Sequence, residues 1–291
     1  MEKLMDNVLG PRTVGPLLTE TFRVYGRHFL KFVAIAAVVE AVCYIPEIVF
    51  GTPGYDPETF DPETVDMVPW DISFAASMLG FTVINSLMDG VFIHAVSEHY
   101  TGGDVSVERA YHFVLKRMKA LVGAAILFWL PIAAIGVSVL GAPNSAGRGS
   151  FTLLIVFPIA MYLMVRWAFI YQAATLEGCE PMDALRRSGK LVDGDWWRVL
   201  GVMVVMFAIT YPVSYALTKI SAVGTVLAGV ILPPIFAIMM ILLYYDLRVR
   251  KEGYTVEKLS EELRAHTTLP ETPATPDGGF GGVPGEDKGS E

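Results

Sequence analysis

The sequence predicts an all-α, polytopic membrane protein whose six transmembrane helices form three hairpins, each preceded by an amphipathic interfacial helix. Three observations lead to this fold class. The composition is 53% apolar and only 18% charged, with a mean hydropathy of +0.47, which is typical of membrane proteins. Several apolar runs reach the roughly 20 residues that a helix needs to cross a bilayer. Of the 22 Lys and Arg residues, 19 fall on one side of the predicted topology, which is the positive-inside pattern.

The chain is expected to hold one membrane domain, residues 1–255, and a polar C-terminal region, residues 256–291. The C-terminal region is predicted to contain a short helix, Val256–Ala265, and then a disordered tail rich in Pro and Gly. The N-terminus begins polar, so no removable signal peptide is expected. The predicted spans are residues 29–50, 72–96, 120–140, 151–174, 199–217 and 225–245.

Three segments have an apolar face at helical spacing and a basic face opposite it: residues 18–29, residues 104–119 and a segment that begins at Pro181. Proline is well suited to the first position of a helix. Helices of this kind lie in the headgroup layer, where each base contributes about 1 kcal/mol of attraction to anionic lipids. The bases serve either as anchors or as a binding surface for headgroups. The headgroup candidates are Arg109, Lys116, Arg117, Arg186, Arg187 and Lys190.

The first, third and fifth spans follow a common pattern, which predicts an internal threefold repeat. Each begins at a basic residue and meets a proline 12 to 15 residues later. The pairs are Lys31 with Pro46, Lys119 with Pro131, and Arg198 with Pro212. The alternative is that any six-span protein with short inner loops shows such a pattern. The prolines are expected to kink their helices, and they free a carbonyl that must find another partner.

The sequence predicts no metal site and no disulfide framework. The connector 51–71 carries six acids and no base, and its prolines predict a solvated loop because the acids lack EF-hand spacing. Cys43 and Cys179 are expected to be ordinary thiols. His94 and His99 flank Glu98 but match no zinc spacing. No metal and no cofactor are predicted, and no basic soluble face suggests nucleic acid as a partner.

Ionisable residues at membrane depth are the strongest functional candidates, since each costs several kcal/mol unless it is paired or hydrated. Glu40 and Arg166 are predicted at comparable depth, so they are expected to form an ion pair. Asp89 competes as a partner for Arg166. The pair would fix helix packing or form the polar centre of a solute or ion site. Arg166 could instead extend toward the basic interface.

The second half of the chain carries a family resemblance. The relevant segments are VRW at 165–167, Glu177, ALRRS at 184–188, KLVDGDWWRVLG at 190–201 and LLYYDLRVRKEG at 242–253. They resemble the membrane domain of the glycerophosphoryl diester phosphodiesterase membrane-domain family, a set of prokaryotic multi-pass proteins. Gly189 stands where that family has an aromatic residue. The resemblance implies a six-helix module in a prokaryotic plasma membrane, and the positive-inside pattern implies that both termini are cytoplasmic.

The resemblance does not extend to enzymatic activity. Some family members carry a soluble phosphodiesterase barrel, which needs about 250 residues. This chain has no HRG motif and only a short polar tail after the last span. We therefore expect a non-enzymatic membrane module that organises membranes, interacts with lipids or scaffolds partners. Its expected partners are the lipid bilayer and either a second copy of the chain or another membrane protein. The alternatives are a transporter or channel with a polar centre at Glu40, Asp89 and Arg166, and an unfamiliar intramembrane enzyme.

Overall fold

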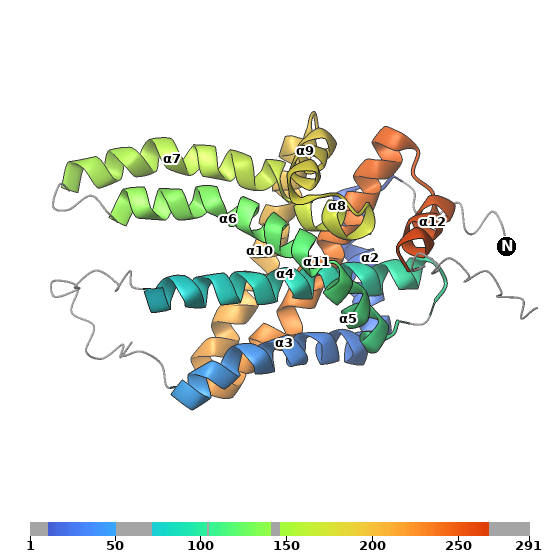
Figure 1. Cartoon of the computed structure of the whole chain (residues 1–291), viewed down its shortest axis with the longest axis horizontal. Coiled ribbons are helices and arrows are strands. Elements are labelled where there is room, and N and C mark those ends of the chain that lie inside the picture. Colours follow the sequence, from blue (N-terminus) through green and yellow to red (C-terminus); the bar gives the residue numbers. More distant parts are fainter. Residues whose placement is uncertain (1–10, 51–71, 104, 141–145, 268–291) are drawn as a thin grey trace, which may run out of the picture.

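The computed structural model describes residues 11–50, 72–103, 105–140 and 146–267, and the regular secondary structure in these ranges is entirely helical (Figure 1). The acidic connector 51–71 and the tail 268–291 lie outside the described residues, as does the side chain of Cys43. The elements are α2 (Val14–Arg27), α3 (Phe29–Phe50), α4 (Ile72–Tyr100), α5 (Val107–Lys116), α6 (Met118–Leu140), α7 (Ala146–Arg166), α8 (Ile170–Leu176), α9 (Pro181–Val192), α10 (Trp196–Ile220), α11 (Ala222–Glu252) and α12 (Val256–Thr267).

The long helices agree closely with the predicted spans, and α3 has the predicted bounds. Four helices among the described residues are long and apolar enough to cross a membrane. They are Leu79–Tyr100, Val156–Leu176, Trp196–Ile220 and Val223–Glu252. A helical membrane protein is therefore supported. Crossing by α3 and α6 as well, which six spans would require, stays a prediction.

The fourth span is not the continuous helix that was predicted. The chain turns at Trp167–Phe169, between α7 and α8, so the helical hydrogen-bond ladder is interrupted. Ser188 of α9 bridges the break: its hydroxyl accepts from the Phe169 N–H at 3.1 Å and donates to the Arg166 carbonyl at 3.0 Å. A side chain from a neighbouring helix thus satisfies backbone groups that the turn would leave unpaired.

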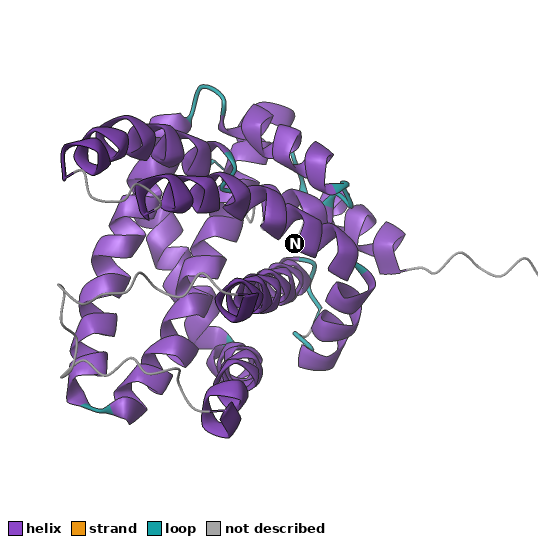
Figure 2. Ribbon diagram, turned by 60° about the vertical axis from the view of Figure 1, so that its left-hand side comes forward, coloured by secondary structure: helices purple, strands orange, loops and turns teal. Residues whose placement is uncertain are grey.

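Two helices connect the bundle. The helix α4 packs against α3, α5, α6, α8 and α11. The helix α11 packs against α2, α3, α4 and α10. Figure 1 shows α3, α4, α6 and α7 with roughly parallel axes, while α10 and α11 cross them and pack on each other. Figure 2 shows the same helices turned by 60°. The cavity described below lies where these two groups meet.

The three predicted amphipathic helices are present as α2, α5 and α9, each directly before the expected long helix. The Ser106 hydroxyl caps α5 by accepting from the Arg109 N–H. Pro181 begins α9, and its ring packs so closely on α6 that a Cβ at Gly123 would lie 2.5 Å from it. The order of elements agrees with the threefold pattern, but true repetition stays a prediction.

The two ends of the bundle differ in packing. On α11, every residue from Ala237 to Leu247 is buried. On α10, the buried residues are Val199, Val202 and Met206, and the remainder of the helix toward Ile220 is apolar and largely exposed. Exposed apolar side chains along a long helix suit contact with lipid tails. The compact core therefore sits at the end where α2, α8, α9 and α12 gather (Figure 1).

Candidate functional site

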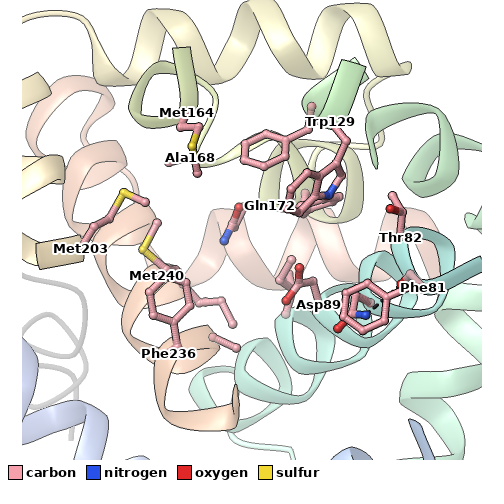
Figure 3. A pocket seen from close by; sticks show the side chains of 16 residues that line it. Phe81, Thr82, Asp89, Trp129, Met164, Ala168, Gln172, Met203, Phe236 and Met240 are labelled. Atoms are coloured by element: carbon pink, nitrogen blue, oxygen red, sulfur yellow. Dashed lines mark hydrogen bonds between the residues drawn. The ribbon is translucent and has the colours of Figure 1, made fainter. Parts of the chain in front are cut away.

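A cavity of about 340 Å³ lies among α4, α6, α8, α10 and α11 (Figure 3). Its wall is mainly apolar and is made of aromatic rings and methionine side chains. Apolar walls with a few convergent polar groups are typical of small-molecule sites. The apolar lining includes Phe81, Phe128, Trp129, Met164, Ala168, Met203, Phe236, Met240 and Ile241.

Asp89 and Gln172 are the central polar groups of this cavity. They come from α4 and α8, and Figure 3 shows both side chains at the space between these helices. Gln172 is buried, and its Oε1 has no hydrogen-bond partner among the described residues. Asp89 likewise forms no ion pair or hydrogen bond within the described part of the chain. A buried polar group without a partner costs free energy, so an occupant could satisfy both groups.

Tyr171 and Asn85 add polar atoms to the same wall. The Tyr171 hydroxyl and the Trp129 indole N–H are both potential hydrogen-bond donors on this wall. Asn85 donates its side-chain N–H to the Phe81 carbonyl at 2.8 Å, which leaves its amide oxygen as an acceptor. The cavity therefore offers acceptor oxygens on Asp89, Gln172 and Asn85 and donor groups on Gln172 and Tyr171.

Glu40 lies elsewhere, between α3 and α11. Its carboxylate occupies the space beside Gly229, where a Cβ would lie 1.8 Å from Oε1. It lines a groove of about 430 Å³ together with hydroxyl side chains of α10 and α11. These hydroxyl residues are Thr210, Ser214, Thr218 and Thr225.

Arg166 does not pair with Glu40, and the predicted ion pair between them is wrong. The Arg166 side chain lies against α9, where a Cβ at Gly189 would be 3.2 Å from its Nε. It donates to the Tyr162 hydroxyl at 3.3 Å on its own helix. Figure 1 shows α7 and α3 on different sides of the bundle. Arg166 is the last residue of α7, and its side chain lies beside α9.

The three residues of the predicted polar centre therefore do not meet. Asp89 lines the cavity, Glu40 lines the groove on α10 and α11, and Arg166 contacts α9. The position of each residue along its predicted span indicates a similar depth in the membrane. That position does not indicate which helices are neighbours in the bundle.

The six headgroup candidates divide into two groups. Arg187 and Arg117 make contacts inside the protein: Arg187 pairs with Glu177, and Arg117 donates to the Ala174 carbonyl at 3.0 Å. The hydrogen bonds of Arg187 to Glu252 and Glu177 hold its pKa above the ordinary value. Arg109 pairs with Glu98 at 3.0 Å and Arg186 with Asp183 at 3.3 Å, but both stay exposed. Lys116 and Lys190 are also exposed.

Sequence reasoning missed a network of charges at the end of α11, which we name the ionic layer: Glu177, Arg187, Arg248, Glu252 and Glu262. The Arg187 Nε donates to Glu177 Oε2 at 2.7 Å, and its Nη2 donates to Glu252 Oε2 at 2.7 Å. Arg248 is 7% exposed and forms a bidentate pair with Glu262, at 2.8 and 3.0 Å. The ionic layer thus joins the α8–α9 connection to α11 and α12.

Two tyrosines complete the ionic layer. The Tyr244 hydroxyl donates to Glu177, and the Tyr254 hydroxyl donates to Glu262 at 2.6 Å. The Arg248 guanidinium lies 3.6 Å from the centre of the Tyr254 ring, which is a close cation–π contact. Burial raises the pKa of Tyr254, so its hydroxyl stays a proton donor at neutral pH.

A second buried carboxylate, Asp246, ties the N-terminal segment to the same end of the bundle. It is 3% exposed and accepts hydrogen bonds from Arg198 at 2.7 Å, Arg250 at 2.9 Å and the Arg12 N–H at 2.5 Å. A carboxylate with several charged donors is well satisfied despite its burial.

The signal that could have found both clusters was present in the sequence. The segments that carry the family resemblance contain Glu177, Arg187, Arg198, Asp246 and Arg248. The positive-inside rule assigns the bases of these segments to the cytoplasmic side and to membrane anchoring, but it gives no role to the acids between them. The structure pairs these acids with the bases.

No family model matches the sequence, and no curated protein or solved structure shows significant similarity to it. The resemblance to the glycerophosphoryl diester phosphodiesterase membrane-domain family therefore stays a prediction that rests on the residues quoted for it.

Proposed function

We propose that this chain is a non-enzymatic membrane module that binds a lipid-like molecule in the cavity around Asp89 and Gln172. The observation that supports this proposal is the combination of an apolar wall with two polar groups, the partly buried Asp89 carboxylate and the buried Gln172 Oε1, that have no partner among the described residues. Three aromatic residues of the wall are partly exposed: Phe81 (54%), Trp129 (42%) and Phe236 (37%). Side chains exposed at this depth face lipid, so a ligand could enter from the bilayer.

The rest of the molecule would place this cavity in its membrane. In this proposal α3 and α6 also cross the bilayer, giving six spans with both termini in the cytoplasm of a prokaryotic cell. The exposed bases on α5 and α9 would contact anionic headgroups. The module belongs, on this proposal, with the family that its second half resembles, and it acts alone, as a homo-oligomer or beside a membrane partner.

A cavity-filling variant tests the proposal. Ala168 lines the cavity, so A168F should place a ring in it and exclude a bound molecule. The matched control is A208F, because Ala208 is exposed on α10 and does not line the cavity. Protein purified in mild detergent is analysed by native mass spectrometry. We expect a bound amphiphile on the wild type and on A208F but not on A168F. Equal occupancy in all three would contradict the proposal.

Transport of a small solute or ion is the second candidate. It is favoured by one observation: Phe236 lines both the cavity of Asp89 and the groove of Glu40, so the two spaces adjoin at this ring. Pro233 lies in α11 at the same place, and prolines within membrane helices can mark mobile segments. Ion flux into proteoliposomes would test this candidate. Flux that rises in F236A and falls in E40Q would support it.

A further inference from the structure

The polar groups of the cavity define what kind of head group it can accept. Asp89 offers two acceptor oxygens, and Gln172 offers a carbonyl that has no donor among the described residues. Asn85 has already used an N–H on the Phe81 carbonyl. A ligand that satisfies the oxygens of Asp89 and Gln172 must donate hydrogen bonds to them.

The charge of the Asp89 carboxylate further restricts the kind of head group that the cavity can bind. Asp89 has no Lys, Arg or His in ion-pair contact within the described residues. The cost of a carboxylate in an apolar site falls strongly when a cation lies beside it. Aromatic rings of Trp129 and Tyr171 line the same wall, and their faces attract cations. The apolar residues Met203, Met240 and Phe236 remain for a hydrocarbon tail.

We infer that the cavity selects a lipophilic primary ammonium ion, with its N–H groups directed at Asp89 and Gln172 and its tail along α10 and α11. This inference rests on the proposed function, because it names the ligand class of the same cavity. The volume of about 340 Å³ holds an ammonium group and the first part of an alkyl chain, with the remainder free to extend past Phe236 into lipid.

Matched probes with one tail and different heads test the inference. The probes are dodecylammonium, dodecyltrimethylammonium, dodecanol and dodecanoate. The full-length protein is placed in phosphatidylcholine nanodiscs, and binding is measured by titration calorimetry after subtraction of empty nanodiscs. For the wild type we expect dodecylammonium to bind about tenfold more tightly than dodecanol, which corresponds to an ion pair that is largely desolvated. The trimethyl probe, which has no N–H to donate, should bind more weakly than the primary ammonium.

Two variants and one control locate the effect. D89N should bring dodecylammonium to within about twofold of dodecanol, because the charge is removed at constant shape. Q172L should weaken dodecylammonium severalfold and keep its preference over dodecanoate. D183N is the control, since Asp183 is an exposed acid of α9 away from the cavity, and it should bind like the wild type.

The possible results separate the inference from the proposal on which it rests. If dodecanol binds as well as dodecylammonium, or if D89N keeps the preference, the ligand class is wrong while binding in the cavity stands. If dodecanoate binds most tightly, the charge assignment is reversed and the inference fails. If no probe binds any variant, both the inference and the proposed function fail.

Discussion

The ionic layer and the cavity contain the same kinds of side chain and treat them in opposite ways. In the ionic layer Glu177, Arg187 and Arg248 are largely buried, and each has charged partners at hydrogen-bond distance. In the cavity Asp89 and Gln172 have no such partner among the described residues. Polar groups that are fully satisfied stabilise one packing of the helices, whereas unsatisfied ones store a cost that a ligand can relieve.

The ionic layer is therefore expected to contribute to the stability of the bundle, and the cavity to its function. The ionic layer joins α9, α11 and α12 through shared charges, so loss of one base there removes a partner from acids on more than one helix. Among the described residues, the cavity can lose the Asp89 charge without breaking an ion pair or a hydrogen bond.

R248A should be the most damaging substitution. It removes the bidentate partner of Glu262 and the cation over Tyr254, so Glu262 keeps the Tyr254 hydroxyl, while Glu177 and Glu252 keep Arg187. Breaking a buried pair costs about 3–5 kcal/mol. The measurement is the free energy of unfolding in detergent by thermal or denaturant titration. K258A is the control, since Lys258 is exposed on α12, and a loss as small as that of K258A would contradict the role of the ionic layer.

G123A should also destabilise the fold, although no charge changes. The new methyl group would lie 2.5 Å from the Pro181 ring, which is rigid and begins α9. Overpacking of this kind typically costs about 1–3 kcal/mol. G201A is the matched control because Gly201 is exposed on α10 with open space around it. The same unfolding titration applies, and G123A as stable as G201A would mean that α6 and α9 are not in close contact.

D89N should behave in the opposite way to R248A. The amide removes a charge that has no partner among the described residues, so the free energy of unfolding should stay constant or rise by about 1 kcal/mol. The measurement is made in the absence of added amphiphile, so that loss of a ligand does not mask the result. A loss of 2 kcal/mol or more, by the order of magnitude expected for a broken buried contact, would show that Asp89 is structural.

The smallest expected effect is a reduced rate of maleimide reaction at the Cys179 thiol. Burial, with the nearby charge of Glu177, raises the pKa of this thiol. Since the thiolate is the reactive form, the maleimide reaction at pH 8 should be slower than that of an exposed thiol and should accelerate on unfolding. The folded state holds the proton more tightly, so this group's contribution to stability is lost as the pH rises through the folded pKa. The chain has two cysteines, so C43S leaves Cys179 as the single reporter. A rate equal to that of free cysteine would contradict the burial.

The helices were predictable because their signals are local. Apolar runs of sufficient length gave α3 with its observed bounds, and apolar spacing gave α2, α5 and α9 before the expected long helices. The turn between α7 and α8 was not predictable in this way, since the run through Trp167 is apolar throughout. It depends on the Ser188 hydroxyl, which comes from another helix.

The candidate site was predicted only in part for the same reason. Asp89 was named because an acid in an apolar run is conspicuous, and it does line the cavity. Gln172 was missed, since a neutral amide changes the hydropathy of its run very little. Glu40 and Arg166 were paired from depth, but the choice of partner depends on the order of helices around the bundle. That order is set by contacts between distant segments, which a single sequence does not display.

Gly189 leaves room that the Arg166 side chain occupies, with its guanidinium within 3.5 Å of where a Cβ would be. An aromatic ring at position 189 would need the same volume. A large side chain at position 189 would therefore displace the Arg166 guanidinium from α9, so the direction in which this arginine extends depends on a glycine of another helix.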